Sequence, residues 1–219
     1  MLSVAKKRMS CKVLETQMLS PSAAIVRFER HGLEFEPGQY IRVGIDGDEE
    51  IRDYSVYSGV NDDFLQVLVR RVEGGLVSKQ LCDVVTGDVL SVGGPYGHFK
   101  LTDEVKSRPV FLIATGTGIS PYHSFATSYP NLDFKLIHGT AKVEEAYESD
   151  FYGERYIHCV SQEEGGDFKG RVTDYLQTLG IPEGTNAFLC GNCDMIYEAF
   201  DLLQSKGLKT SQIHTEVYF

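Results

Sequence analysis

Pro109-Val-Phe-Leu-Ile-Ala-Thr-Gly-Thr-Gly-Ile-Ser-Pro121 decides the fold of the second half of the chain. Residues 109–114 form a continuous apolar run, which is typical of a strand buried in a parallel sheet. Glycines and a helical stretch follow at once, so the segment predicts a strand, a turn and a helix. Amides in such a turn face the carboxyl end of the sheet, where a dinucleotide diphosphate fits. A turn that only joins strand to helix is the alternative, and the two threonines favour binding.

The segments downstream repeat this alternation of strand and helix. Apolar runs predict strands at 134–138, 155–160 and 187–190, and helical stretches lie at 144–151, 172–179 and 195–206. Strands that alternate with helices form a parallel sheet covered by helices. We therefore predict a C-terminal α/β domain with a parallel, nucleotide-binding sheet.

The N-terminal half has a different pattern, because residues 11–99 break into short apolar or alternating runs separated by turn-rich pieces such as Glu36-Pro-Gly-Gln39. Strands are predicted at 24–28, 40–45, 53–57, 64–70 and 89–92, with one helix at 78–84 that begins at a serine. This spacing is typical of a small antiparallel β-barrel. We place the boundary near 101–108, so residues 1–103 form the barrel domain and residues 104–219 the α/β domain.

The composition is that of an ordinary globular protein, with 219 residues, 42% of them apolar, and a formal charge of −10. That charge disfavours nucleic acid and anionic membranes as partners. No apolar run approaches the length of a spanning helix, and residues 1–15 lack the apolar centre of a secretory signal, so we expect a cytoplasmic protein. Five scattered cysteines favour free thiols over a disulfide framework or a metal site.

Arg52-Asp-Tyr-Ser55 combines three groups that suit a flavin. The guanidinium suits a diphosphate, the tyrosine ring suits packing on an isoalloxazine, and the serine hydroxyl suits a hydrogen bond to the flavin. Taken alone, the motif is better interpreted as a barrel strand with a surface arginine and a half-buried tyrosine.

Arg70-Arg-Val-Glu-Gly-Gly-Leu-Val-Ser78 places glycines and a hydroxyl at the expected start of a helix. Free N–H groups and the helix dipole favour an anion there, so the segment is a candidate cradle for a diphosphate. The alternative is that Ser78 only caps the helix while the glycines only turn the chain.

Cys190-Gly-Asn192 follows a predicted strand, again at the carboxyl edge of the sheet. With Cys193 it gives Cys-x-x-Cys, yet no second pair supports a metal site and no thioredoxin-like strand and helix accompany it. A single thiol beside the nicotinamide is the better interpretation. The apolar ending Thr215-Glu-Val-Tyr-Phe219 predicts a last strand on the sheet or a terminus that something else covers.

These segments, together with Gly93-Gly-Pro-Tyr-Gly-His-Phe99, resemble in order and spacing the ferredoxin–NADP reductase superfamily, from about Val13 to Phe219. No ferredoxin-type cysteine cluster is attached, so the chain resembles the minimal two-domain members. The resemblance implies FAD on the barrel, NADH or NADPH on the α/β domain, and hydride transfer between them. Electrons would then pass to a ferredoxin, a flavodoxin or an oxygenase component.

The same resemblance implies roles for particular residues. Ser55, Cys190 and Glu216 match residues around the reacting centre, and Tyr218 or Phe219 would lie over the flavin and move to admit the nicotinamide. The implied flavin positions are Arg52, Tyr54, Ser55, Val69, Arg71, Gly75, Leu76, Val77 and Ser78. The implied nucleotide positions are Thr115, Gly116, Thr117, Gly118, Pro121, Gly139, Lys142, Ser161, Arg171, Cys190, Gly191, Asn192 and Met195.

The pocket for the 2′ end of the nucleotide departs from the family pattern. NADPH-specific members usually present arginines where this chain has Gly139-Thr-Ala-Lys142 and Ser161-Gln-Glu-Glu164. Only Lys142 and Arg171 remain to pair with a 2′-phosphate, and the two glutamates would repel one. The chain therefore favours NADH, with dual use left open.

Two further functions stay open at this point. A reductase of free flavin would retain flavin weakly, and a regulatory subunit would bind flavin without passing electrons. Finding Ser55, Cys190 and Glu216 together disfavours the regulatory subunit. The charge of −10 argues against docking an acidic carrier unless a local basic face forms. The candidates for that face are Lys6, Lys7, Arg8, Lys12 and the arginines near residue 70.

Overall fold

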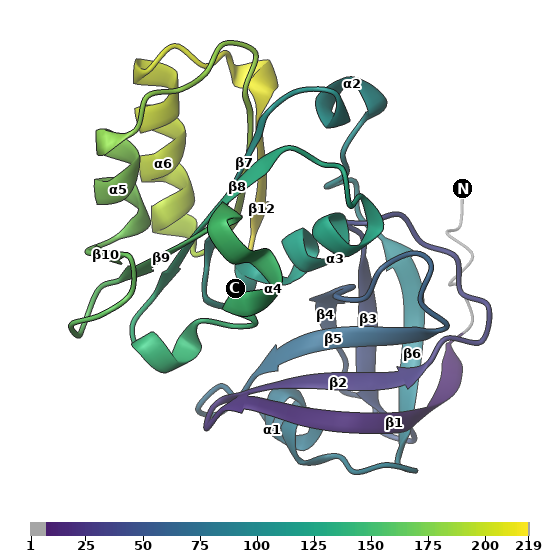
Figure 1. Cartoon of the computed structure of the whole chain (residues 1–219). Helices are drawn as coiled ribbons and strands as arrows, with labels where there is room; N and C mark the ends of the chain where they lie inside the picture. Colours follow the sequence, from purple (N-terminus) through teal and green to yellow (C-terminus); the bar gives the residue numbers. More distant parts are fainter. Residues whose placement is uncertain (1–7, 219) are drawn as a thin grey trace. The chain divides into compact units, whose positions relative to one another are not determined.

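The computed structural model describes residues 8–218, which divide into two compact units (Figure 1). The first contains residues 8–100 and 123–128, and the second contains residues 101–122 and 129–218. Each unit is built on its own six-stranded sheet. None of the helices within residues 8–218 is long and apolar enough to cross a membrane.

The first unit is an antiparallel barrel, as predicted. Its strands are β1 (Met9–Ser20), β2 (Ala23–Glu29), β3 (Tyr40–Ile45), β4 (Arg52–Ser55), β5 (Phe64–Arg70) and β6 (Val89–Tyr96). They pair in the order β4-β3-β6-β1-β2-β5, and every pair is antiparallel. A bridge between Val56 and Val67 joins the end of β4 to β5, so the two edges of the sheet meet. Closure removes the unpaired strand edges that an open sheet would expose.

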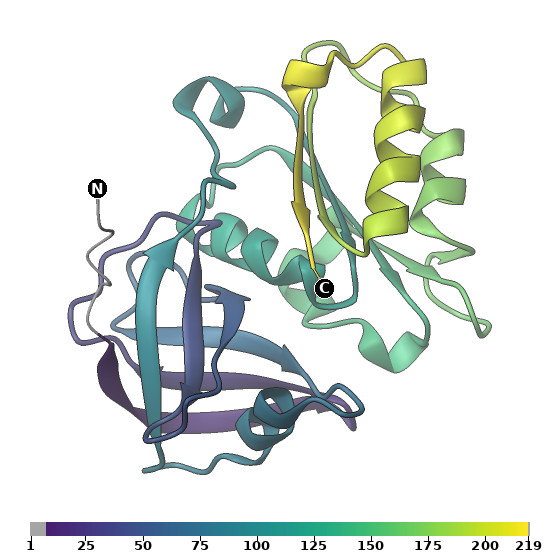
Figure 2. The ribbon, with the colours of Figure 1, turned by 180° about the vertical axis from the view of Figure 1, so that it is seen from behind.

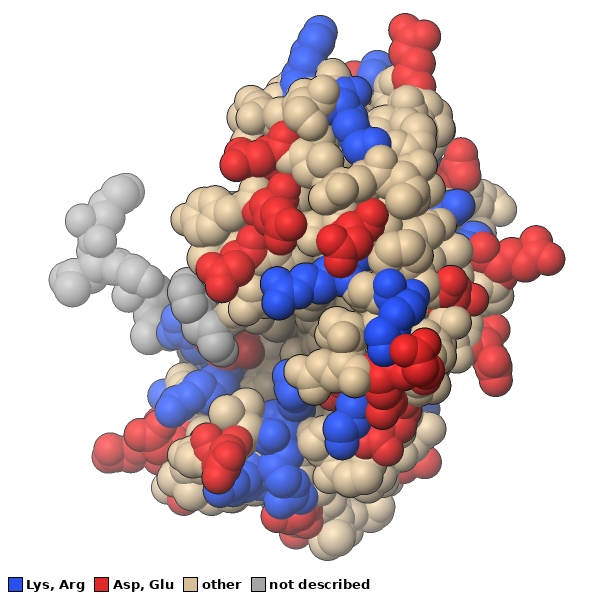
Figure 3. All heavy atoms as spheres, turned by 90° about the vertical axis from the view of Figure 1, so that its left-hand side faces the viewer, with Lys and Arg blue, Asp and Glu red and all other residues tan. Residues whose placement is uncertain are grey.

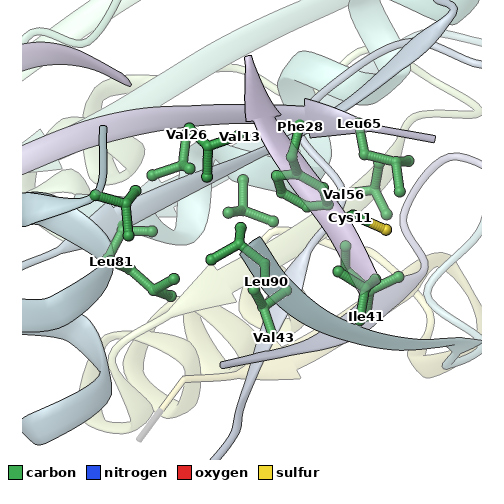
Figure 4. Packing of buried hydrophobic residues seen from close by; sticks show 14 of the residues in the cluster. Cys11, Val13, Val26, Phe28, Ile41, Val43, Val56, Leu65, Leu81 and Leu90 are labelled. Atoms are coloured by element: carbon green, nitrogen blue, oxygen red, sulfur yellow. The ribbon is translucent and has the colours of Figure 1, made fainter. Parts of the chain in front are cut away.

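Alternate side chains of these strands fill the inside of the barrel. Figure 4 shows Val13, Val26, Phe28, Leu65 and Leu90 among the side chains that pack together there. Burying large aliphatic side chains gives each about 1.5–3 kcal/mol of favourable transfer free energy. This shared core is what holds the strands in register.

Strand β1 is the barrel element that the sequence pattern did not predict. Cys11 and Val13 face the core, while Leu14 and Met18 are exposed on the outside. The outward face therefore carries apolar residues and the alternation of apolar and polar residues is blurred. Pairing with β2 and β6 forms the strand in spite of its weak local pattern.

Helix α1 (Leu76–Asp83) begins two residues earlier than predicted, and Ser78 is not its cap. Gly75 occupies the capping position, and the Ser78 hydroxyl accepts a hydrogen bond from the Val72 amide at 3.2 Å. Ser78 therefore closes the turn that precedes the helix.

The second unit is a parallel sheet covered by helices, which confirms the predicted α/β architecture. Its strands are β7 (Val110–Thr115), β8 (Phe134–Thr140), β9 (Tyr156–Val160), β10 (Phe168–Lys169), β11 (Asn186–Gly191) and β12 (Ile213–Val217). They pair in the order β10-β9-β8-β7-β11-β12, all parallel. Helices α5 (Val172–Thr178) and α6 (Cys193–Ser205) lie side by side against one face (Figure 2).

Further helices complete the connections, and one predicted helix is wrong. The remaining helical elements are α2 (Asp103–Lys106), η1 (Gly116–Ile119), α3 (Ser120–Ser128), η2 (Val143–Glu145), α4 (Ser149–Tyr152), η3 (Gly153–Arg155) and η4 (Thr210–Gln212). The helix predicted over 144–151 is split into η2 and α4. Glu148 adopts a left-handed conformation, φ +49°, and the Glu145 carboxylate turns back to bind the amides of Ala141 and Lys142. The left-handed residue is incompatible with a continuous helix, whereas the Glu145 carboxylate caps the start of η2.

Candidate functional site

The predicted nucleotide turn connects β7 to α3 through η1 and packs directly on the end of β11. Gly116 has a positive φ of +52°, a conformation that favours glycine. A Cβ atom on Gly118 would overlap the carbonyl of Cys190. Position 118 therefore requires glycine because another backbone lies against it.

The Thr115 hydroxyl joins the turn after β7 to the turn after β11. It accepts a hydrogen bond from the Asn192 amide at 2.9 Å. Gly191, at φ +128°, has no room for a Cβ because the backbone and hydroxyl of Thr115 lie against it. Asn192 in turn caps α6 by accepting from the Met195 amide at 3.1 Å. The structure thus brings Thr115, Gly118, Gly191 and Asn192 together at the carboxyl edge of the sheet, where parallel sheets bind ligands.

Cys190 and Glu216 are direct neighbours, because they pair across β11 and β12. The Tyr218 amide donates to the Gly191 carbonyl at 2.9 Å, so the chain stays beside this position after β12 ends. Burial raises the pKa of the Cys190 thiol well above its usual value, the Glu216 charge raises it further, and a hydrogen bond with the Tyr218 side chain opposes the shift. Cys190 is therefore a neutral thiol next to a carboxylate. Phe219 lies outside the described residues.

The loop after β8 is held by acidic side chains. Glu145 is buried, and its carboxylate accepts hydrogen bonds from the Ala141 and Lys142 amides, each at 3.1 Å. Glu163 accepts from the Val143 amide at 2.5 Å. Three consecutive amides are thus satisfied by carboxylates of the chain itself.

The other residues predicted for this end of the sheet surround the same loop. Ser161 is exposed and donates its hydroxyl to the Thr140 carbonyl at 3.1 Å. The exposed Lys142 ammonium lies 3.8 Å from Glu144, and the exposed Arg171 precedes α5. A Cβ on Gly139 would lie 2.7 Å from Val172, so the start of α5 packs on the end of β8. The remaining predicted nucleotide residues, Pro121 and Met195, are both buried.

The sequence interpretation missed His138, which lies in β8 directly before Gly139. The ring is fully buried, with Nε2 at 2.8 Å from the Gly116 carbonyl and Nδ1 at 2.7 Å from the Tyr156 hydroxyl. Burial lowers the pKa of His138 to about 3. The signal available in the sequence was an imidazole at the end of the largely apolar strand 134–138.

In the barrel unit, the candidate flavin strand is β4. Arg52 is exposed, and its guanidinium binds the Glu50 carboxylate at 2.8 Å and the Ile51 carbonyl at 2.7 Å. Tyr54 is half-buried, and desolvation by burial is the main cause that raises its pKa. Ser55 is buried and pairs with Tyr40 of β3.

The segment before α1 has the properties of an anion site. Gly75 occupies the capping position and has no side chain to cap the helix, and a Cβ there would lie 2.7 Å from the Ser78 hydroxyl. The first amides of a helix have no partner within the helix, so a diphosphate fits them. The Arg71 guanidinium lies beside this turn and pairs with Asp83.

The other residues predicted for this segment have different surroundings. Val69 and Val77 point into the barrel core, so only their backbones are available to a ligand. Leu76 is 55% exposed, which leaves its side chain available for contact with a ligand.

The chain is similar to known proteins in both sequence and fold. A family model of the oxidoreductase FAD-binding domain matches residues 10–101. The electron transfer component of toluate 1,2-dioxygenase from Pseudomonas putida is 29% identical over 201 residues, covering 85% of this chain and 59% of that protein. The ferredoxin–NADP reductase of Azotobacter vinelandii is 28% identical over 212 residues and covers 82% of each. This chain therefore spans less than two thirds of the dioxygenase component.

The fold is also shared with solved structures. A ferredoxin–NADP reductase from Neisseria gonorrhoeae, solved with bound FAD and NADP, superimposes with a TM-score of 0.88 at 22% identity, covering 97% of this chain and 99% of that one. The fold match therefore extends over both units, whereas the family model matches only the barrel region. Residues 10–101 therefore match an oxidoreductase FAD-binding domain, most of the chain is similar in sequence to ferredoxin–NADP reductases and to a dioxygenase electron transfer component, and the chain shares its two-unit fold with a ferredoxin–NADP reductase.

Proposed function

We propose that this protein oxidises NADH with FAD bound to residues 1–103 and that residues 104–219 hold the nicotinamide nucleotide. The observation that carries the proposal is the pair of turns joined by the Thr115–Asn192 hydrogen bond, beside the Cys190–Glu216 pair. The electrons would leave for a ferredoxin, a flavodoxin or an oxygenase component. The similarity to the toluate dioxygenase electron transfer component and to the Azotobacter reductase supports that class of acceptor.

The residues of the chain would bind and orient FAD and the nucleotide, and would not themselves react. Bound FAD supplies the hydride chemistry, and the protein supplies alignment and electrostatics. In the proposal, Arg52, Arg71 and the start of α1 hold the diphosphate of FAD, while Tyr54 and Ser55 contact its ring. Arg52 and Arg71 already bind carboxylates, so a diphosphate would replace or share those partners.

At the nicotinamide, Cys190 would provide a neutral packing surface and Glu216 a negative charge. A carboxylate beside the ring favours the form in which the nicotinamide is positively charged, which is the oxidised product. Tyr218 or Phe219 would cover the flavin until the nucleotide displaces it.

We infer a preference for NADH from the loop after β8. A 2′-phosphate needs hydrogen-bond donors and positive charge. The amides of Ala141, Lys142 and Val143 already bind the carboxylates of Glu145 and Glu163, so a phosphate at these amides would meet like charge. An acidic residue at this end of the second strand instead suits the ribose 2′-hydroxyl of NADH.

The acceptor is proposed only as a class. Figure 3 shows lysine and arginine side chains interleaved with aspartate and glutamate on the face that it displays. Arg8 and Lys12 remain candidates for a basic docking surface, while Lys6 and Lys7 lie outside the described residues. We also propose a cytoplasmic location, because all five cysteines are free thiols and reducing compartments keep thiols in that state.

The first test is a visible spectrum of the purified protein followed by ferricyanide reduction with NADH and NADPH in parallel. We expect a bound flavin and a higher kcat/KM with NADH. A protein that carries flavin but passes electrons from neither nucleotide would overturn the proposal and favour a regulatory subunit. Loss of flavin on purification, with reduction of added free flavin, would favour a flavin reductase.

A further inference from the structure

The buried ring of His138 lies beneath the glycine turn and contacts it at one backbone atom. Its Nε2 is 2.8 Å from the carbonyl oxygen of Gly116, and its Nδ1 is 2.7 Å from the Tyr156 hydroxyl. A carbonyl oxygen only accepts hydrogen bonds, so Nε2 must carry the proton. Because the buried ring is neutral, Nδ1 accepts from the Tyr156 O–H. The tautomer of His138 is therefore fixed by its two partners.

This contact determines which way one peptide plane faces. The peptide that joins Gly116 to Thr117 is planar and trans, so its N–H points opposite to its carbonyl. With the Gly116 carbonyl turned towards His138, the Thr117 amide faces away from the ring. The next carbonyl, that of Thr117, is likewise held by the Ser120 hydroxyl at 2.7 Å. Both carbonyls of the turn are thus bound within the fold.

Without the histidine, the Gly116 carbonyl would lose its hydrogen bond to the ring, and the short helix η1 would hold the peptide after Gly116 less firmly. Gly116 has no Cβ and has φ +52°, a region where glycine meets little steric resistance. A turned peptide would present a carbonyl oxygen to the diphosphate in place of an N–H, and two oxygens with negative charge repel each other.

Resting on the proposed function, we infer that His138 is a positioning residue for nucleotide binding. It acts through the Gly116 carbonyl to direct the Thr117 amide towards the diphosphate. Tyr156 supports it by holding the tautomer that donates from Nε2.

The test compares two substitutions of His138 that both introduce a side-chain amide but differ in side-chain length. The glutamine amide nitrogen in His138→Gln lies near the position of Nε2, whereas the amide in His138→Asn reaches only the position of Nδ1. We expect His138→Asn to weaken binding of ADP-ribose, which carries the diphosphate without the reactive ring, by roughly tenfold, the effect of losing one hydrogen bond in a buried site. His138→Gln should recover most of that loss. The measurement is calorimetric titration of the flavin-loaded protein.

If His138 had a purely structural role, its loss would change thermal stability but not the affinity for ADP-ribose. His214→Leu removes a partly buried histidine of β12, whose Nε2 has no partner among residues 8–218, and serves as the control for a lost ring. It should change thermal stability without changing the Kd for ADP-ribose. In turnover, His138→Asn should raise KM for NADH and leave kcat nearly unchanged.

The outcomes separate this inference from the proposed function. If the wild-type protein does not bind ADP-ribose or NADH, the proposed function fails. If the wild type binds and His138→Asn binds equally well, or if the asparagine and glutamine variants are equally weak, only the role of His138 is refuted. If His138→Asn does not fold, Tyr156→Phe decides, because it keeps the ring and removes the donor to Nδ1. A Kd raised severalfold in Tyr156→Phe supports the role, and an unchanged Kd refutes it.

Discussion

Gly118 lies where the turn after β7 meets the last residues of β11. A Cβ at this position would overlap the Cys190 carbonyl, which belongs to a strand and cannot move aside. We predict that Gly118→Ala lowers the free energy of unfolding by about 1–3 kcal/mol, the usual cost of forcing a carbon into a packed site, and also weakens nucleotide binding. Urea unfolding and ADP-ribose titration measure the two effects.

Gly180→Ala is the matched control, because nothing lies within 4 Å of a Cβ at that position. It should leave stability within about 0.5 kcal/mol of the wild type, as for most surface changes. Equal behaviour of the two alanine variants would show that the turn shifts freely and that position 118 does not require glycine.

At the scale of one element, the loop after β8 sets the choice between the two nucleotides. Glu163→Gln removes a negative charge that binds the Val143 amide, whereas Glu164→Gln removes one that pairs with Lys169 instead. We expect Glu163→Gln to raise the ratio of kcat/KM for NADPH over NADH by roughly tenfold, since one charge contact in a partly screened site contributes about 1.4 kcal/mol. Glu164→Gln should change it much less, because surface pairs contribute little.

Steady-state kinetics with both nucleotides measures these ratios. An unchanged ratio in Glu163→Gln, or an equal rise in both variants, would contradict the role that we give to the loop amides.

The elements also show what the sequence can predict. Strands β3 and β5 match their predictions to the residue, because their apolar runs are bounded by clear turn signals. The turn at 115–118 was found because its two glycines lie two positions apart, directly after an apolar run. The split of the helix predicted over 144–151 depends on the left-handed conformation of Glu148, which a local pattern of helix formers does not encode.

The missed parts of the site depend on contacts between distant residues. His138 meets Gly116 across 22 positions, and Glu163 meets Val143 across 20. A single sequence gives the residue types but not these pairings, because strand order decides which residues meet. Those pairs become visible only when β7, β8 and β9 are aligned in register.

For the whole molecule, three histidines of the α/β unit make its stability depend on pH. Burial lowers the pKa of His138 to about 3 and also lowers the pKa values of His158 and His214, all in the α/β unit. Between about pH 6.5 and 3 the unfolded chain binds a proton that folded His138 does not, so acid favours unfolding. We therefore predict that these histidines leave the stability of the α/β unit constant above about pH 6.5 and lower it progressively below that pH. The slope from His138 alone is about 1.4 kcal/mol per pH unit.

Hydrogen exchange at pH 7, 6 and 5, corrected for the intrinsic rate, measures the two units separately. Protection should fall first in the strands of the α/β sheet, and His138→Gln should reduce the slope. Equal loss of protection in both units, or none in the α/β unit, would contradict the prediction.

The cysteines give the protein an intrinsic labelling position. Four thiols are buried and Cys193, the first residue of α6, is partly exposed. Burial raises the pKa of Cys11 to about 11 and that of Cys159 to about 12, so these thiols rarely form the reactive thiolate. A maleimide dye offered to the folded protein should therefore select Cys193, next to Asn192. The native chain thus accepts a fluorescent reporter beside the Thr115–Asn192 contact, without any cysteine being added or removed.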